Sequence, residues 1–247
     1  DNYIDWKEWL GPAKNVKWGR DAGIDRFFRF RKYWEYSCGG IAGDLLYHNI
    51  APVHIAMGGD QAPFPYRVTG TGSINLFKGT ETSDIFTITA DYEDGNQLVF
   101  SCSILNAVHV PGLIRGHEAT IRLVPHGTFE RSVDTFTVFP EPIFMDGFRE
   151  KCADAGLTGT WRDIDYTQWS WRRREWQAVP ELTVTTERRE SHMENFLRCV
   201  RSREEPVLNA RTGYKIQTVI SMAIKSFVEG KMVYFDAEKE KIRGGAP

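Results

Sequence analysis

Asp44 and His48 are the residues whose types and spacing most directly suggest chemistry. They stand four positions apart, shortly after Gly39-Gly40. On a helix this spacing places both side chains on one face, about one turn from each other. An imidazole that titrates near neutrality can accept the proton that leaves a carbinol during oxidation by hydride transfer. The carboxylate could orient the ring or hold a substrate hydroxyl, so the pair predicts acid–base chemistry with His48 and Asp44 as catalytic residues.

Two plainer interpretations of this pair stay open. An aspartate in the first turn of a helix is often only a cap or a partner of the helix dipole. Zinc binding by Asp44, His48 and His54 is conceivable, since carboxylate and imidazole are both zinc ligands. The sequence has no cysteine pair and no His-Glu-x-x-His pattern to accompany them. We therefore predict no metal site.

An aromatic and basic stretch precedes the pair, at residues 27–36. Tyr33 and Tyr36 could stack on the apolar faces of a sugar, and Arg31 could bond its hydroxyl or carboxylate groups. Core packing and a solvated basic edge are the alternative for most residues of this stretch. We take Tyr33, Tyr36 and Arg31 as candidate substrate-binding residues.

The element that must position Asp44 and His48 is a helix that opens at Gly39-Gly40. Leu45, Leu46, Ile50 and Val53 are spaced for burial on one side, and Gly58-Gly59 marks its end. Pro52 predicts a kink or a break near Asn49.

Strands are expected from residue 66 to about 139. Residues 86–92 and 98–104 alternate between apolar and polar around the turn residues Glu93-Asp94-Gly95-Asn96, which predicts a hairpin. Further strands are expected at 67–77, 119–124 and 129–139, giving an antiparallel sheet of at least four strands. The side chains expected to face the helices are Phe86, Ile88, Leu98 and Phe100.

Residues 140–186 show little periodicity and are expected to form a long excursion over the sheet. Ser191-His192-Met193-Glu194 is a capping box that opens one helix, and a second helix ends at Gly230. Strands followed by segregated helices predict an α+β fold, with a large open antiparallel sheet carrying helices on one face. Gly70-Thr71-Gly72 lies in a strand pattern, so we expect no cofactor loop in this chain. Residues 1–247 are expected to be a single domain.

The composition of the chain limits the classes of binding partner that we expect. The 247 residues carry a formal charge of −2, which gives no global attraction to nucleic acid or to an anionic membrane surface. No apolar stretch approaches the length of about 20 residues that a bilayer span needs. Four cysteines far apart suit reduced thiols, so we expect a cytoplasmic protein, or a periplasmic one if an export signal precedes this sequence.

Three stretches resemble the Gfo/Idh/MocA oxidoreductases, such as glucose-fructose oxidoreductase and inositol dehydrogenase, in their C-terminal substrate domain. They are residues 6–12 with the lead into 33–36, the segment from Gly39-Gly40 through Asp44 to His48, and residues 191–203 with Pro206 and Gly213. The resemblance implies that His48 is the catalytic histidine and Asp44 its partner carboxylate. It also implies a mainly antiparallel sheet whose other face often makes oligomer contacts.

Family members carry an N-terminal Rossmann domain and a Glu-Lys-Pro segment, neither of which this sequence contains. The resemblance therefore implies that NAD or NADP is bound mainly by a domain absent from this chain, in an oxidoreductase acting on a sugar or polyol. A homo-oligomer formed through the sheet face is also expected. The alternative is a non-catalytic carbohydrate-binding or oligomerisation module derived from the family.

Overall fold

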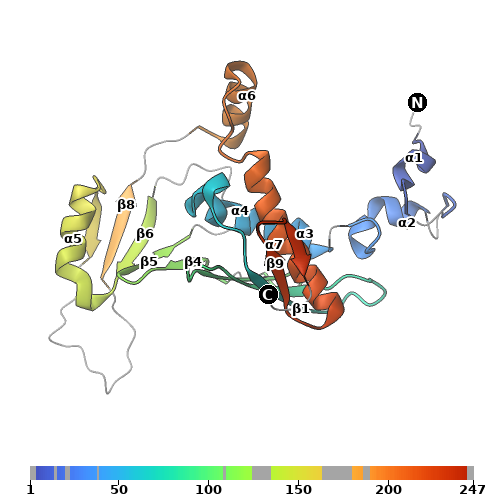
Figure 1. Ribbon diagram of the computed structural model, residues 1–247, viewed down its shortest axis with the longest axis horizontal. Helices are drawn as coiled ribbons and strands as arrows, with labels where there is room; N and C mark the ends of the chain where they lie inside the picture. Colours follow the sequence, from blue (N-terminus) through green and yellow to red (C-terminus); the bar gives the residue numbers. More distant parts are fainter. Residues whose placement is uncertain are drawn as a thin grey trace. The chain divides into compact units, whose positions relative to one another are not determined.

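The computed structural model describes residues 4–13, 16–19, 23–37, 39–107, 110–123, 135–162, 180–185 and 190–243 (Figure 1). The chain divides into two compact units, Asp1–Ala107 with Asn195–Pro247, and Val108–Glu194. Each unit has its own five-stranded antiparallel sheet. The expected α+β fold, with antiparallel sheet and packed helices, is confirmed.

The first unit is built on a sheet with the strand order β10-β9-β1-β2-β3. All its paired strands are antiparallel. Its strands are β1 (Arg67–Ser73), β2 (Ile85–Asp91), β3 (Gln97–Ser103), β9 (Val233–Asp236) and β10 (Lys241–Arg243).

One face of this sheet is covered by helices α4 (Leu46–Ala56) and α7 (Ala210–Glu229). Gly70 of β1 lies directly under α7, because a Cβ there would stand 2.1 Å from the carbonyl oxygen of Ala223. Its N–H donates to Ser226 Oγ at 3.1 Å. The glycine thus serves close strand–helix packing, and Gly70-Thr71-Gly72 is part of a strand rather than a phosphate loop.

The predicted hairpin is β2 and β3. Phe86 lies opposite Cys102 and Ile88 opposite Phe100, so their side chains share a face. Phe86 and Ile88 are fully buried, and Leu98 and Phe100 pack against the same core, which confirms that these four residues face the helices. Gly95 takes a positive φ of 89° at the turn.

The helix expected after Gly39-Gly40 is two segments, α3 (Ile41–Asp44) and α4. The helix is interrupted at Leu45, and α4 runs without a break through Asn49, so the break predicted there is wrong, while a kink there stays a prediction. Pro52 lies inside α4, where it lacks only the N–H that would donate to the His48 carbonyl. Burial of Ile50 and Ala51 in the core stabilises the helix through that position.

The second unit contains a sheet with the order β4-β5-β6-β8-β7. Its elements are β4 (Leu113–Arg115), β5 (Ala119–Arg122), β6 (Thr135–Pro140), η3 (Pro142–Phe144), α5 (Met145–Asp154), β7 (Gly159–Arg162) and β8 (Glu181–Thr185).

A small core joins α5 to this sheet. Cys152 of α5 is buried with Val138, Leu182 and Val184. Residues 140–186 were expected to form a long ordered excursion over the sheet; instead they contain α5 and two strands of the second sheet, β7 and β8. The segments 124–134 and 163–179, with part of an expected strand and the tryptophans Trp169, Trp171 and Trp176, lie outside the described residues.

The remaining elements precede and follow the core of the first unit. They are α1 (Trp6–Leu10), α2 (Gly23–Phe28), η1 (Phe30–Lys32), η2 (Gly59–Gln61) and α6 (His192–Ser202). The predicted capping box opens α6: Ser191 N donates to Glu194 Oε2 at 2.6 Å, and Glu194 N donates to Ser191 Oγ at 3.2 Å. Among the described helices, none combines the length and apolar character that crossing a bilayer requires.

Candidate functional site

The candidate site begins at the glycine corner before α3. Gly39 and Gly40 take φ values of 92° and 60°, which side chains disfavour. A Cβ on Gly40 would stand 2.5 Å from the Thr82 Cβ, and one on Gly39 would stand 2.1 Å from the Ile224 Cδ1. Only glycines let the chain pass between these two neighbours, and their passage fixes where α3 starts.

Asp44 and His48 lie on either side of the joint between α3 and α4. Asp44 is the last residue of α3, and His48 lies in the first turn of α4. Leu45 keeps helical dihedrals, φ −88° and ψ −43°, and its N–H donates to the Ile41 carbonyl at 2.9 Å. The spacing of one helical turn between Asp44 and His48 is therefore kept across the joint. Asp44 is half-buried, and His48 is exposed.

Arg31 binds the carboxylate of Asp44 with two bonds. Its Nη2 donates to Oδ1 at 2.9 Å, and its Nε lies 2.8 Å from Oδ2. This bidentate geometry fixes the plane of the carboxylate and leaves its remaining lone pairs for other donors. The structure thus brings together two of the predicted site residues.

A short clamp holds Arg31 in place. The Arg31 carbonyl accepts from Thr82 Oγ1 at 2.7 Å, and the Lys32 carbonyl accepts from the Glu81 N–H at 2.8 Å. The Trp34 N–H donates to Glu81 Oε2 at 3.0 Å. Sequence reasoning missed Glu81 and Thr82, since they lie in a loop before β2 with no periodicity or motif to mark them.

The side chain of Tyr33 contacts other residues of the segment that precedes α3. Its hydroxyl donates a short hydrogen bond to Asp25, and Arg26 lies over its ring at 4.7 Å from the centroid. The hydrogen bond from Tyr33 lowers the pKa of the Asp25 carboxyl, and the charges of Lys32 and Arg29 lower it further. The same bond raises the pKa of Tyr33.

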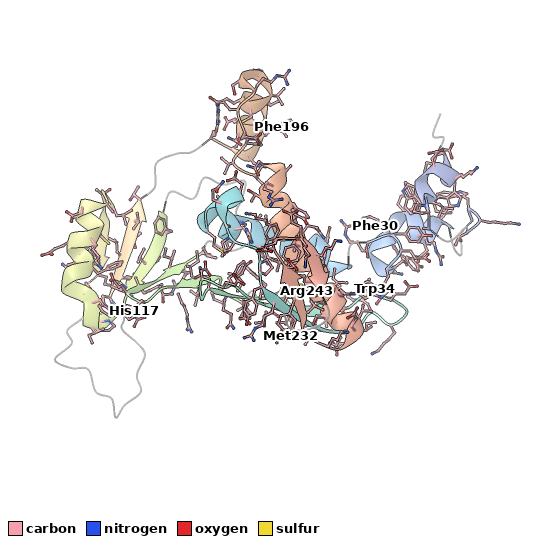
Figure 2. All side chains as sticks on the ribbon, viewed as in Figure 1. Phe30, Trp34, His117, Phe196, Met232 and Arg243 are labelled. Carbon is pink, nitrogen blue, oxygen red and sulfur yellow. The ribbon has the colours of Figure 1, made fainter. Side chains whose placement is uncertain are left out.

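Tyr36 lies beside an aromatic cluster. Its ring stacks on Trp9 with centroids 5.3 Å apart, and Trp9 stacks on Trp6 at 4.7 Å. An open pocket of about 550 Å³ is found here, lined by Trp9, Leu10, Phe27, Phe30, Glu35 and Tyr36. Figure 2 labels Phe30 and Trp34 of this segment.

His54 is buried in the core of the first unit. Its Nε2 lies 3.2 Å from the Tyr92 hydroxyl, and burial, helped by the charge of Lys215, lowers the pKa of its imidazole to about 4. Within the described part of the chain, no three or more His, Cys, Asp or Glu side chains gather as a metal ion would require. The geometry that the site offers is therefore a fixed carboxylate and an exposed imidazole, one turn apart.

The sequence matches a family of known proteins over most of its length. The matching family is the Gfo/Idh/MocA oxidoreductase family, C-terminal alpha/beta domain, and the match covers residues 13–235. The chain belongs to this family. The resemblance noted on the Gly-Gly, Asp44 and His48 segment is thereby confirmed at the level of the family. No curated protein sequence shows significant similarity to this chain.

Solved structures share the fold at low sequence identity. An NAD-binding oxidoreductase from Klebsiella pneumoniae superposes with a TM-score of 0.56 and 12% identity, covering 83% of this chain and 53% of that one. An NAD-binding protein from Listeria innocua gives a TM-score of 0.53 and 14% identity, covering 83% of this chain and 54% of the other. The chain thus spans about half the length of these relatives.

The family supports an oxidoreductase but assigns no residue of this chain. His48 and Asp44 as catalytic residues, and Arg31, Tyr33 and Tyr36 as substrate-binding residues, stay predictions. The structure adds that the hydroxyl of Tyr33 bonds Asp25, that Tyr36 belongs to the pocket beside Trp9, and that Arg31 acts on Asp44 directly.

Proposed function

We propose that this chain is the substrate-binding half of an NAD(P)-dependent oxidoreductase that acts on a sugar, polyol or related hydroxyl-rich compound. The observation that carries the proposal is the Arg31–Asp44–His48 arrangement. A carboxylate fixed by a bidentate guanidinium lies one helical turn from an exposed imidazole. A structural helix start needs neither the histidine nor the clamp that positions Arg31.

The roles of the residues follow from their chemistry. His48 accepts the proton of the substrate hydroxyl as that carbon is oxidised. Asp44 accepts a hydrogen bond from a neighbouring hydroxyl through a lone pair that Arg31 leaves open, and so orients the substrate toward His48. Arg31 holds the carboxylate of Asp44 in one plane.

A nicotinamide cofactor would supply the hydride acceptor when bound. The residues described here do not fit a dinucleotide loop at Gly70-Thr71-Gly72, because that segment is a strand packed against α7. A pyrophosphate is held by backbone N–H groups at a strand-to-helix turn. We therefore assign the binding of NAD or NADP mainly to a second half of the polypeptide.

The substrate class rests on the pattern of groups near the site. Asp44 offers acceptor lone pairs and Arg31 offers N–H donors to hydroxyl groups, and Tyr36 with Trp9 presents aromatic surface in a pocket open to solvent. Aromatic rings that pack on C–H faces, with charged groups at the edge, are the usual means of holding a sugar.

The proposal is tested with the complete polypeptide and a panel of sugars and polyols, by following the absorbance of NADH or NADPH. We expect at least one substrate to reduce a nicotinamide cofactor, and His48→Ala to lower turnover by about 10² to 10⁴, the usual contribution of a positioned base. His117→Ala, which removes another exposed histidine, is the matched control and should keep full turnover. Sugar binding without any cofactor reduction would favour the non-catalytic binding module instead.

We also propose a homo-oligomer that forms through the sheet face opposite α4 and α7. Val99 of β3 is exposed there, and Thr87 and Ser101 bond to each other at 3.0 Å on neighbouring strands. Val99→Lys should shift the sedimentation coefficient toward the monomer. Val228→Lys, at an exposed position on α7, is the control, and an unchanged oligomer in both variants would refute this interface.

A reducing compartment is the environment that suits the thiols. Cys102, Cys152 and Cys199 are free and buried. Burial raises the pKa of the Cys102 thiol to about 12, which keeps it protonated and unreactive. We propose the cytoplasm on this ground.

A further inference from the structure

Thr82 connects two parts of the candidate site that lie far apart in the sequence. Its Oγ1 donates to the Arg31 carbonyl at 2.7 Å. Its side chain also lies against the backbone of Gly40, where an added Cβ would stand 2.5 Å from Thr82 Cβ, 2.7 Å from Oγ1 and 3.0 Å from Cγ2. Gly40 precedes α3, and α3 ends at Asp44. A single residue that is 5% exposed therefore contacts the backbone on both sides of the Arg31–Asp44 pair.

The backbone of Arg31 depends on contacts with distant residues. Arg31 lies in η1, a 3-10 helix of three residues. A helical segment this short is stabilised by its surroundings rather than by its own hydrogen bonds. The Glu81 N–H donates to the Lys32 carbonyl at 2.8 Å, and Glu81 Oε2 accepts from the Trp34 N–H at 3.0 Å. With the Thr82 hydroxyl, these bonds fix the chain from which the Arg31 side chain extends.

The loop that carries Thr82 is fixed by Asp84. The Asp84 residue is 1% exposed. Its carboxylate accepts from the backbone N–H groups of Asn75 at 2.9 Å, Leu76 at 2.8 Å and Phe77 at 3.2 Å. A buried carboxylate with several backbone donors resists displacement, because moving it would leave a charge without partners. Thr82 therefore belongs to a rigid loop.

A purely structural role does not explain where the Thr82 hydroxyl points. A buried hydroxyl needs an acceptor, and a nearby carbonyl is enough, as for Thr218, whose Oγ1 donates to the Tyr214 carbonyl at 2.8 Å. Thr82 instead bonds a carbonyl 51 positions away. The Arg31–Asp44 pair that this bond supports is too exposed to contribute much to stability. Its fixed geometry is therefore the property that Thr82 serves.

We propose that Thr82 is a positioning residue for substrate binding, which acts through Arg31 on the Asp44 carboxylate. This inference rests on the proposed function, which assigns a substrate hydroxyl to Asp44. The Thr82 hydroxyl sets where the Arg31 backbone lies, and its packing against Gly40 sets where α3 starts. The guanidinium then meets the carboxylate in bidentate geometry. A carboxylate held in one plane before binding accepts a hydroxyl without first having to be ordered.

Steady-state kinetics of the complete polypeptide test this role. Thr82→Val keeps the shape of the side chain and removes its hydroxyl. It should raise KM about fivefold and change kcat by less than about twofold, because substrate binding is affected and proton transfer is not. Thr82→Ser keeps the hydroxyl and should leave KM within about twofold of the unsubstituted value. A KM that rises as much in Thr82→Ser as in Thr82→Val would overturn the proposal.

Thr218→Val is the matched control. Thr218 is also 5% exposed, and its hydroxyl bonds a carbonyl of its own helix, α7. Both valine variants remove one buried hydroxyl that donates to a carbonyl, so their thermal midpoints should fall by similar amounts. Only Thr82→Val should raise KM. An equal rise of KM in the two variants would assign the effect to general destabilisation and refute the positioning role.

A double-mutant cycle with Arg31→Gln separates an action through Arg31 from an independent effect. If Thr82 acts through the guanidinium, Thr82→Val should leave KM unchanged in a protein that already carries Arg31→Gln. Independent effects would instead multiply, so that KM of the double variant would rise by the product of the two single factors. That product would contradict the proposal.

NMR spectroscopy of the complete polypeptide measures the same contact without turnover. The Arg31 Nε lies 2.8 Å from Asp44 Oδ2, which slows exchange of its proton with water. Arg31→Gln assigns the signal by removing it. We expect exchange about tenfold faster in Thr82→Val and unchanged in Thr218→Val, because only the first loosens the pair. Unchanged exchange in Thr82→Val would overturn the proposal, whatever the substrate.

These two measurements keep the inference apart from the proposed function. Faster exchange of the Arg31 Nε proton in Thr82→Val, with no cofactor reduction by the unsubstituted protein on any sugar or polyol, would refute the proposed function. It would leave the positioning of Arg31 by Thr82 standing. Cofactor reduction by the unsubstituted protein, with KM factors that multiply in the cycle, would do the reverse.

Discussion

The guanidinium of Arg31 holds both carboxylate oxygens of Asp44, with N–O separations of 2.9 and 2.8 Å. The two residues lie thirteen positions apart and meet only because Glu81 and Thr82 fix the backbone of residues 31–34. Their side chains are 52% and 39% exposed. At that exposure the pair contributes little to stability, so its geometry points to a positioning role.

Removing the guanidinium should therefore change function more than stability. Arg31→Gln is expected to lower the free energy of unfolding by less than about 1 kcal/mol, as for other exposed pairs, and to raise KM by about tenfold, because the Asp44 carboxylate loses its fixed plane. The measurements are urea unfolding and steady-state kinetics. Arg29→Gln removes a comparable exposed pair with Asp25, and an equal rise of KM in both variants would argue against the positioning role.

Substitutions of Asp44 and of His48 should change different kinetic constants. Asp44→Ala is expected to affect substrate affinity more than turnover, since the carboxylate holds a hydroxyl in both ground and transition states. His48→Ala should lower turnover with a small change in KM, because a proton moves only in the transition state. Initial rates over a range of substrate concentrations give both constants. The opposite pattern would exchange the two roles.

The buried His54 makes stability depend on pH. Burial, helped by the charge of Lys215, lowers the pKa of the His54 imidazole from 6.5 to about 4. Between these pH values the unfolded chain binds a proton at His54 that the folded chain does not bind. This stability is complete above pH 6.5 and is lost as the pH falls toward 4. Between pH 7.5 and 5 the imidazole should account for a loss of roughly 2 kcal/mol, at 1.36 kcal/mol per pKa unit.

Urea unfolding at the two pH values checks this expectation. His54→Leu should show a smaller loss between pH 7.5 and 5 than the unsubstituted protein. Tyr92→Phe keeps the buried imidazole and removes only its 3.2 Å partner, so it should retain the full loss. An equal loss of unfolding free energy between the two pH values in His54→Leu would show that other groups produce the pH dependence.

Lys215 connects α7 to the residues around η2 through hydrogen bonds. Its buried side chain donates to the carbonyls of Asp60 and Ala62, both at 2.5 Å, and burial, followed by the charge of Arg211, lowers the pKa of its ammonium. Lys215→Met leaves both carbonyls without this donor and should cost about 2 to 4 kcal/mol of stability. Lys225→Met on the same helix removes an exposed pair with Glu229 and should cost less than about 1 kcal/mol. Equal midpoints of chemical unfolding would show that water replaces the Lys215 contacts.

Local patterns in the sequence predicted several elements correctly and singled out the Asp44–His48 pair, whose catalytic role stays a prediction. The alternation around Glu93-Asp94-Gly95-Asn96 predicted the β2–β3 hairpin and its buried face, because side-chain direction in a strand has a period of two. The capping box and Gly230 predicted where α6 begins and α7 ends. Asp44 and His48 were singled out because residues four positions apart on a helix share one face.

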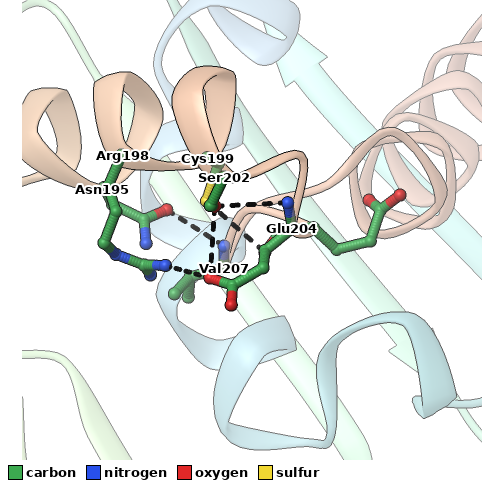
Figure 3. Close-up of polar contacts among 7 residues, drawn as sticks. Asn195, Arg198, Cys199, Ser202, Glu204 and Val207 are labelled. Atoms are coloured by element: carbon green, nitrogen blue, oxygen red, sulfur yellow. Dashed lines mark hydrogen bonds and ion pairs between the residues drawn. The ribbon is translucent and has the colours of Figure 1, made fainter.

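The tertiary structure decided what local patterns do not encode. Pro52 stays inside α4 because burial of its neighbours outweighs one missing hydrogen bond. Arg31 is held beside Asp44 by Thr82, which lies 51 positions further along the chain. The apolar stripe on α6 could be read from the sequence, but the hydrogen bonds that join Arg198 to Glu204 and Asn195 to Val207 could not (Figure 3). Periodicity shows which side chains share a face; only long-range contacts determine what that face meets.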